Sequence, residues 1–178
     1  MKEDICNYII TQAQAIPQDV YIISLIIFCA GIFIFCGVKG VKDGFRYSMA
    51  LLFVEYVVLL MCSTVIYRNT YQKRNYDFTP ILEYKTDIGE KDPLLPENIM
   101  NVVVFVPIGL ISAAALRKYR FLLATIIGCA ISVIIEAMQF YYRKGISEVD
   151  DVFCNTLGCI FGVSLCLLFI KVYKLCHC

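Results

Sequence analysis

Five long apolar segments constrain this chain more than any other feature. A helix of about 20 apolar residues crosses the roughly 30 Å hydrocarbon core of a bilayer. Hydrophobic residues make up 60% of the 178 residues, whereas soluble domains contain about 45–50% apolar residues. The sequence therefore predicts an all-α fold, a polytopic membrane helical bundle with about five transmembrane helices. We expect these spans at residues 20–38, 47–67, 98–116, 121–142 and 151–173.

Charge and cysteine content exclude several other classes of protein. A formal net charge of +1 gives no support to a nucleic-acid partner. Many of the ten cysteines lie inside apolar segments, where cysteine behaves as a small hydrophobe, so we expect no disulfide framework. The terminal Cys176, His177 and Cys178 lack the second half of a zinc-binding spacing. No metal site and no cofactor is predicted.

The chain divides into four stretches. Residues 1–19 form an N-terminal segment, and residues 20–73 hold the first two spans, their connector and the start of a long loop. Residues 74–162 carry the richest motifs, and residues 163–178 complete the last span and the tail. Within the second span, Glu55 is interpreted as a hydrogen-bonded carboxyl that helps to lock the bundle.

Basic residues set the expected orientation. With the N-terminus outside, the inner and outer segments each hold eight Lys or Arg residues. The inner ones crowd into short connectors, and short loops weigh most in the positive-inside rule. We therefore expect the N-terminus outside and the C-terminus inside. In any five-span arrangement the long loop and the hairpin at 143–150 share one membrane face.

The fourth and fifth spans each carry a stripe of polar and small residues at helical spacing. Gly158 and Gly162 form a GxxxG pattern, which permits close helix approach, so we expect the two stripes to pack face to face. Asn101, at the start of the third span, should lie near their polar ends. The stripes are Gly128, Ser132, Glu136, Gln139 and Arg143 on the fourth span, and Asp151, Asn155, Gly158 and Gly162 on the fifth.

The polar ends of these stripes allow two interpretations. In the architectural one, Asp151 caps the fifth helix while Asn155, Gln139 and Glu136 satisfy one another. In the functional one, Glu136 and either Glu148 or Asp151 form a carboxylate pair for acid/base chemistry or cation binding. Spacing alone does not choose between them.

Motifs around this cluster resemble the VanZ-like family of bacterial membrane proteins. Their order and spacing agree over residues 74–162, and the first span lies outside the resemblance. Three positions depart from the family pattern: Asp77 replaces the usual Asn, Ile81 an aromatic residue, and Glu148 an Asp. The matching residues are Arg74, Phe78, Thr79 and Pro80; Asn101, Phe105, Pro107 and Gly109; Glu136, Gln139 and Phe140; and Asp151, Val152, Asn155, Thr156 and Gly158.

The resemblance implies a multi-pass protein of the bacterial cytoplasmic membrane that acts at the cell envelope. The family's namesake is linked to resistance against teicoplanin-type lipoglycopeptides. Expected partners are a membrane lipid, a lipid-linked envelope precursor or a lipoglycopeptide antibiotic, and the sequence favours binding over catalysis. The candidate binding residues are Arg74, Asn101, Glu136, Gln139, Glu148, Asp151 and Asn155.

Two alternatives from other classes stay open. A membrane-embedded hydrolase or transferase would use Glu136 as general base, with Glu148 or Asp151 as its partner or as a metal ligand, and its candidate catalytic residues are Glu136 and Asp151. No obvious nucleophile accompanies them. A small transporter would need a polar path through the midplane, and Glu55 is the only deep charge.

Overall fold

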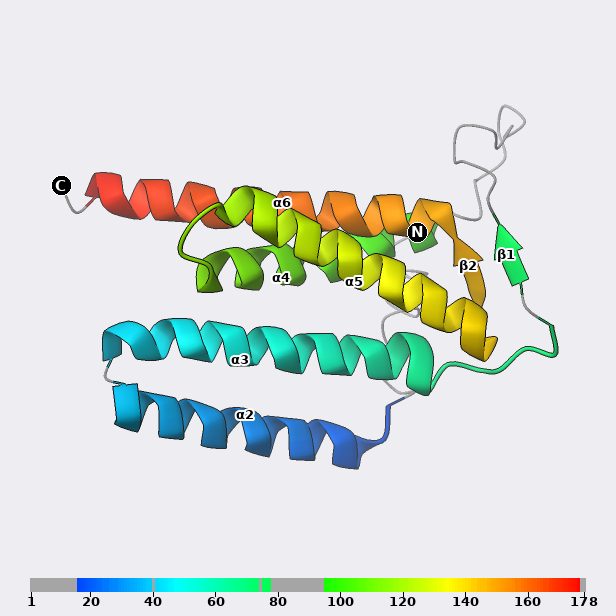
Figure 1. Cartoon of the computed structure of the whole chain (residues 1–178), viewed down its shortest axis with the longest axis horizontal. Coiled ribbons are helices and arrows are strands. Elements are labelled where there is room, and N and C mark those ends of the chain that lie inside the picture. The colour runs from blue at the N-terminus through cyan, green and yellow to red at the C-terminus, as the bar shows by residue number, and fades with distance from the viewer. Residues whose placement is uncertain (1–15, 40, 74, 78–94, 177–178) are drawn as a thin grey trace.

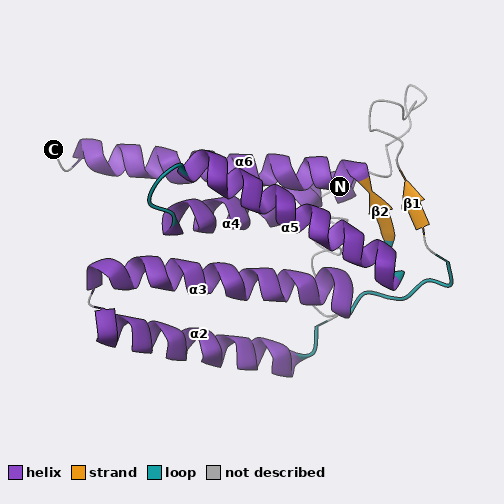
Figure 2. Cartoon of the chain, viewed as in Figure 1, coloured by secondary structure: helices purple, strands orange, loops and turns teal. Residues whose placement is uncertain are grey.

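The described part of the chain is a bundle of five α-helices. The computed structural model describes residues 16–39, 41–73, 75–77 and 95–176. Figures 1 and 2 show the helices together with two short strands at one end of the bundle. The helices are α2 (Gln18–Lys39), α3 (Val41–Met61), α4 (Leu95–Ala115), α5 (Arg120–Tyr142) and α6 (Val149–Cys176), and the strands are β1 (Asn75–Asp77) and β2 (Ile146–Glu148).

The apolar segments form these helices, and the all-α fold is confirmed. Four helical stretches, at Gly44–Ile66, Glu97–Ala115, Arg120–Tyr142 and Val149–Cys176, are long and apolar enough to cross a membrane. The apolar stretch of α2, Gln18–Ile34, is shorter over the described residues. At the end of α3 the chain continues through a π-helical turn, η1, at Cys62–Ile66.

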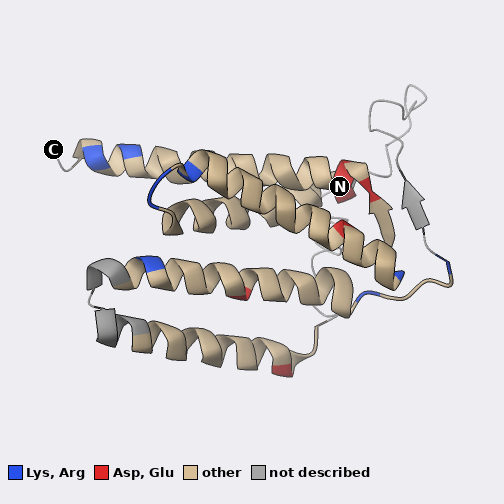
Figure 3. Cartoon of the chain, in the orientation of Figure 1, with Lys and Arg blue, Asp and Glu red and all other residues tan. Residues whose placement is uncertain are grey.

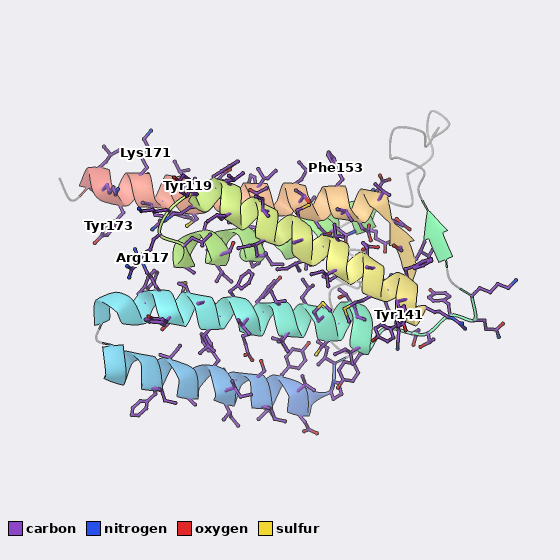
Figure 4. The ribbon with its side chains drawn as sticks, in the orientation of Figure 1. Arg117, Tyr119, Tyr141, Phe153, Lys171 and Tyr173 are labelled. Atoms are coloured by element: carbon purple, nitrogen blue, oxygen red, sulfur yellow. The ribbon has the colours of Figure 1, made fainter. Side chains whose placement is uncertain are left out.

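The outer surface of this bundle is apolar and suited to contact with lipid. Large apolar side chains such as Phe33 on α2 and Phe153 on α6 are mostly exposed. In Figure 4, Phe153 points away from α6, Tyr141 lies at the end of the bundle near the strands, and Tyr119 and Tyr173 lie towards the other end. Tyrosines are enriched at both membrane–water interfaces, so this distribution suits a bundle that spans a bilayer.

The helices form two groups. Helices α2 and α3 run side by side as one pair, and α4, α5 and α6 pack together as the other (Figure 1). Inside the second group, Ile108 of α4 and Cys159 and Val163 of α6 are completely buried. Tyr56 of α3 joins the two groups, because its hydroxyl donates a hydrogen bond of 2.7 Å to the Val104 carbonyl of α4.

The closest helix pair is α4 with α6, and not α5 with α6. A Cβ atom added to Gly158 would lie 2.1 Å from the Val102 carbonyl oxygen, and one added to Gly162 would lie 2.0 Å from that of Val106. The expectation that the GxxxG pattern packs against the fourth span is therefore wrong. Both glycines instead allow the backbone of α4 to approach α6 closely. A larger residue at either position would keep the two helices apart.

Helix α5 meets α6 through side chains. The Cys159 thiol occupies the space beside Gly128, where an added Cβ would lie 2.3 Å from its sulfur. Further along the same contact, the Asn155 amide donates to the Ser132 hydroxyl at 2.8 Å. The two predicted stripes are thus in contact, but the glycine that makes room for the other helix is Gly128 on α5, which accommodates Cys159 of α6.

The hairpin between α5 and α6 is attached to the segment that follows η1. The Tyr71 amide donates to the Arg143 carbonyl at 2.8 Å, and the Lys144 ammonium donates to the Arg68 carbonyl at 2.8 Å. Beyond this segment, β1 pairs in parallel with β2, with Asp77 opposite Glu148. Arg143 does not extend the α5 stripe as predicted, because it ends the helix in a left-handed conformation with φ 59°.

Candidate functional site

A cavity of about 140 Å³ lies where η1, α4, α5 and α6 meet. Many of its lining residues belong to the end of the bundle at which α5 ends and α6 begins; Figure 1 shows how the helices are arranged there. Its apolar wall includes Leu60, Met100, Val104, Phe105 and Ile135, and its polar wall is formed by Ser63, Thr64, Arg68, Glu97, Asn101, Glu136, Gln139, Asp151 and Asn155. Five of the predicted binding residues therefore share one cavity.

Asp151 joins α6 to α4 across this cavity. Its Oδ1 accepts a hydrogen bond of 2.6 Å from the Asn101 side-chain amide. Asp151 is the third residue of α6, so it lies beyond the N-cap position that the architectural interpretation assigned to it. The first turn of a helix still favours a carboxylate, because the peptide dipoles place partial positive charge there. Asp151 is therefore positioned by its partner and by the helix end together.

Glu136 links α5 to the hairpin. Its Oε2 accepts the backbone N–H of Glu148 at 3.0 Å, and the Ser147 side chain also hydrogen-bonds to it. Only 6% of Glu136 is exposed, whereas Glu148 is half-buried. The hydrogen bond between these two predicted partners thus comes from the Glu148 backbone. The hairpin therefore holds the buried Glu136 carboxyl in place at the cavity wall.

Gln139 and Asn155 each leave one buried oxygen without a partner. The Gln139 amide nitrogen donates to the Thr64 carbonyl at 3.2 Å, and that of Asn155 donates to Ser132. The Gln139 Oε1 and Asn155 Oδ1 atoms accept no hydrogen bond from the described residues. The interpretation that Glu136, Gln139 and Asn155 hydrogen-bond to one another is therefore wrong, because each of them bonds to a residue outside this set.

Two charged residues of the cavity were missed from the sequence. Arg68 and Glu97 form an ion pair of 3.9 Å, and the Arg68 guanidinium packs on Gly145, whose added Cβ would lie 2.7 Å from its Cζ. Gly145 has φ +99°, a conformation that favours glycine. The sequence did hold a signal, because Arg68 directly follows the second span and Glu97 directly precedes the third, on the face shared with the hairpin.

The remaining candidates lie elsewhere. Arg74 falls outside the described residues, as does most of the long loop. Glu55 accepts a hydrogen bond from the Ser24 hydroxyl of α2, the interhelical role expected for it. Across the described ranges, no group of three or more His, Cys, Asp and Glu residues is arranged to hold a metal ion.

Comparison with known proteins agrees with this architecture. Residues 22–170 match the VanZ/LLP1 family, a range that includes the first two helices as well as the cavity. Protein VanZ of Enterococcus faecium is 30% identical over 95 residues, which cover 53% of this chain and 54% of that relative. The matched region thus spans about half the length of this curated relative. No solved structure matches the chain. Since the family match covers most of a bundle of apolar helices, this multi-pass membrane protein belongs to the VanZ/LLP1 family.

Proposed function

We propose that this protein binds the head group of an amphiphilic or lipid-linked envelope molecule in the cavity between α4, α5 and α6. The observation that supports this most is a pair of buried oxygens without a hydrogen-bond partner, which belong to Gln139 and Asn155, two residues that line the cavity. An unsatisfied buried polar group costs about 1–3 kcal/mol. A ligand that donates to these atoms would recover this free energy on binding.

The charge distribution supports an outward-facing cavity in the bacterial cytoplasmic membrane. Acidic residues lie mainly towards the cavity end of the bundle, whereas basic residues lie at both ends (Figure 3). Away from the cavity, the charged residues at the helix ends whose side chains the structure describes are basic: Arg46, Arg117, Lys118, Arg120, Lys171 and Lys174. Positive charge is retained on the cytoplasmic side. The N-terminus and the cavity would then face outward and the C-terminus inward.

An outward-facing head-group site suits a role in antibiotic tolerance. Lipoglycopeptides and lipid-linked envelope precursors meet at the outer leaflet, and both carry a polar head on a lipid tail. Similarity to Protein VanZ and to a family whose namesake is linked to teicoplanin-type resistance supports this class of ligand. This chain would reduce the action of such drugs by binding either the drug or the envelope molecule with which it competes.

Ligand binding requires fewer specific groups at this site than catalysis does. A hydrolase or transferase needs an activated nucleophile, but the Ser132 hydroxyl is fully buried and bonded to Asn155. The hydroxyls of Ser63 and Thr64 both donate to the Leu60 carbonyl, the ordinary arrangement for these residues in a helix. The cavity therefore favours a binding protein over an enzyme.

The binding role is tested with Glu136→Gln and Asp151→Asn, which remove charge and keep size. Both variants should lower teicoplanin tolerance in cells and weaken amphiphile binding by the purified protein, because a carboxylate hydrogen bond is about twice as strong as a neutral one. Glu55→Gln is the matched control, since Glu55 is an intramembrane carboxyl outside the cavity. Unchanged tolerance and binding in both variants, at normal expression, would refute the proposed function.

Orientation is tested separately with single introduced cysteines. Ile146 in the hairpin and Tyr119 in the opposite connector are both exposed. In a background whose other exposed cysteines are replaced by serine, Ile146→Cys should react with an impermeant maleimide on intact cells. Tyr119→Cys should react only after permeabilisation. The reverse pattern would place the cavity on the inner face.

A further inference from the structure

We infer that the cavity selects a protonated amine, that is, a primary ammonium on the head group of its amphiphilic ligand. This inference rests on the proposed function and narrows its ligand class. It is carried by the balance of hydrogen-bond donors and acceptors, the balance of charge, and the size and lining of the cavity.

The cavity offers acceptors to a ligand. Three amides of its lining already donate within the protein: that of Asn101 to Asp151, that of Gln139 to the Thr64 carbonyl, and that of Asn155 to Ser132. The amide oxygens of Gln139 and Asn155 remain without a donor. Both side chains are at least nine-tenths buried and line the cavity. A complementary ligand therefore has to bring N–H or O–H groups.

The charges of the lining residues favour a cationic ligand. Three carboxyl side chains, Glu97, Glu136 and Asp151, line the cavity together with one guanidinium, that of Arg68. Arg68 forms the ion pair with Glu97 at the rim, and its charge also acts on Glu136 and Asp151. The two more deeply buried carboxyls, Glu136 and Asp151, are held by neutral donors, an amide of Glu148 and an amide of Asn101. Since three carboxyls face one guanidinium, a cationic ligand would favour their charged forms, and an anionic ligand would disfavour them.

Size and lining favour an organic ammonium over a bare ion. An engineered cavity of roughly 150 Å³ in another protein holds one benzene molecule, so a cavity of about 140 Å³ admits a small head group but no entire lipid. Its apolar wall, which includes Phe105 and Ile135, suits carbon atoms next to the charge. A primary ammonium supplies three N–H donors on one compact cation, so it combines the positive charge that the carboxyls favour with the donors that the unpartnered amide oxygens lack.

Three single-chain probes separate charge from hydrogen-bond donation. Dodecylamine carries both, dodecyltrimethylammonium carries charge without N–H groups, and N-dodecylacetamide is neutral. Titration of the purified full-length protein, followed by native mass spectrometry, should give a dissociation constant for dodecylamine that is on the order of 30-fold lower than for the other two. Equal affinity for the amine and either of the other probes would overturn the inference.

Two cavity variants and one control locate the effect. Asp151→Asn keeps an oxygen for the Asn101 amide and removes the charge. Asn155→Leu removes an unpartnered oxygen. Both variants should lower the affinity for dodecylamine on the order of 10-fold or more. Glu55→Gln should leave it unchanged. If both cavity variants bind all three probes as the wild type does, the proposed function fails as well. If they weaken all three equally, the cavity binds amphiphiles and only amine selectivity fails.

Competition then identifies the source of the amine. Phosphatidylethanolamine in nanodiscs should displace dodecylamine if the natural ligand is a lipid head group, and its N-acetylated form should not. Teicoplanin should displace the probe, and N-acetylated teicoplanin should not, if the antibiotic itself is bound. No difference between the amine and its N-acetylated form for both compounds would contradict amine recognition.

Discussion

One methyl group added at Gly158 should damage both the helix packing and the cavity. In Gly158→Ala the new Cβ would lie 2.1 Å from the Val102 carbonyl oxygen, whereas a normal C···O contact is roughly 3.3 Å. The obstacle is backbone, so α4 and α6 must separate by about 1.2 Å. Val102 directly follows Asn101, whose bond to Asp151 is 2.6 Å long. A separation of this size would stretch that bond beyond the roughly 3.2 Å limit of an ordinary hydrogen bond.

The expected loss of stability combines three contributions. Overpacking costs about 1–3 kcal/mol, and loss of a hydrogen bond to a charged group costs about 1.5–3 kcal/mol. Replacing glycine by alanine within a helix returns about 1 kcal/mol. The net destabilisation is therefore about 3 kcal/mol. For a chain of this length, 1 kcal/mol corresponds to about 2–4 °C in melting temperature, so Gly158→Ala should melt roughly 6–12 °C lower.

The chain contains its own reporter and its own control for this experiment. Cys62, Cys154, Cys159 and Cys166 are free and buried, so a thiol-reactive fluorophore reports unfolding in detergent. Gly31→Ala is the matched variant, because its Cβ would lie 2.2 Å from Leu51 Cδ2, the movable end of a side chain. Gly31→Ala should melt at or above the wild-type temperature. A Gly158→Ala protein that melts no lower than Gly31→Ala would refute the packing argument.

Three further substitutions test single contacts. Asp151→Ala leaves the half-buried Asn101 amide without its partner and should lower the free energy of unfolding by about 1–3 kcal/mol. Asp151→Asn should lose clearly less, and equal losses in thermal melts would contradict the contact. Tyr56→Phe removes the bond to the Val104 carbonyl and should cost about 1 kcal/mol, and an unchanged melting temperature would show that this bond does not hold the two helix groups together. Lys144→Met removes two bonds to backbone carbonyls after α3 and should speed amide exchange in residues 66–72, with unaltered exchange in α2 as the internal control.

Local patterns were sufficient for the helices and for the residues that face inward. Apolar length predicted the helical spans to within a few residues at most ends, because crossing a bilayer requires a minimum number of residues per helix. The 3.6-residue period placed Gly128, Ser132, Glu136 and Gln139 on one face, and all four are buried on α5. The gathering of polar residues at one end of the bundle also followed from the alternating direction of successive spans. These properties depend on neighbours along the chain.

The pairing of those faces required the tertiary structure. A stripe on a helix covers a range of directions, and only the packing of all neighbours decides which helix it meets. This is why Gly158 and Gly162 admit the backbone of α4 and not that of α5, and why Asp151 bonds to Asn101 instead of capping its own helix. Arg68 and Glu97 enter the cavity from spans that are separated by the long loop. The unpartnered oxygens of Gln139 and Asn155 are likewise invisible in the sequence, because whether a buried group is satisfied depends on atoms that only the folded bundle brings beside it.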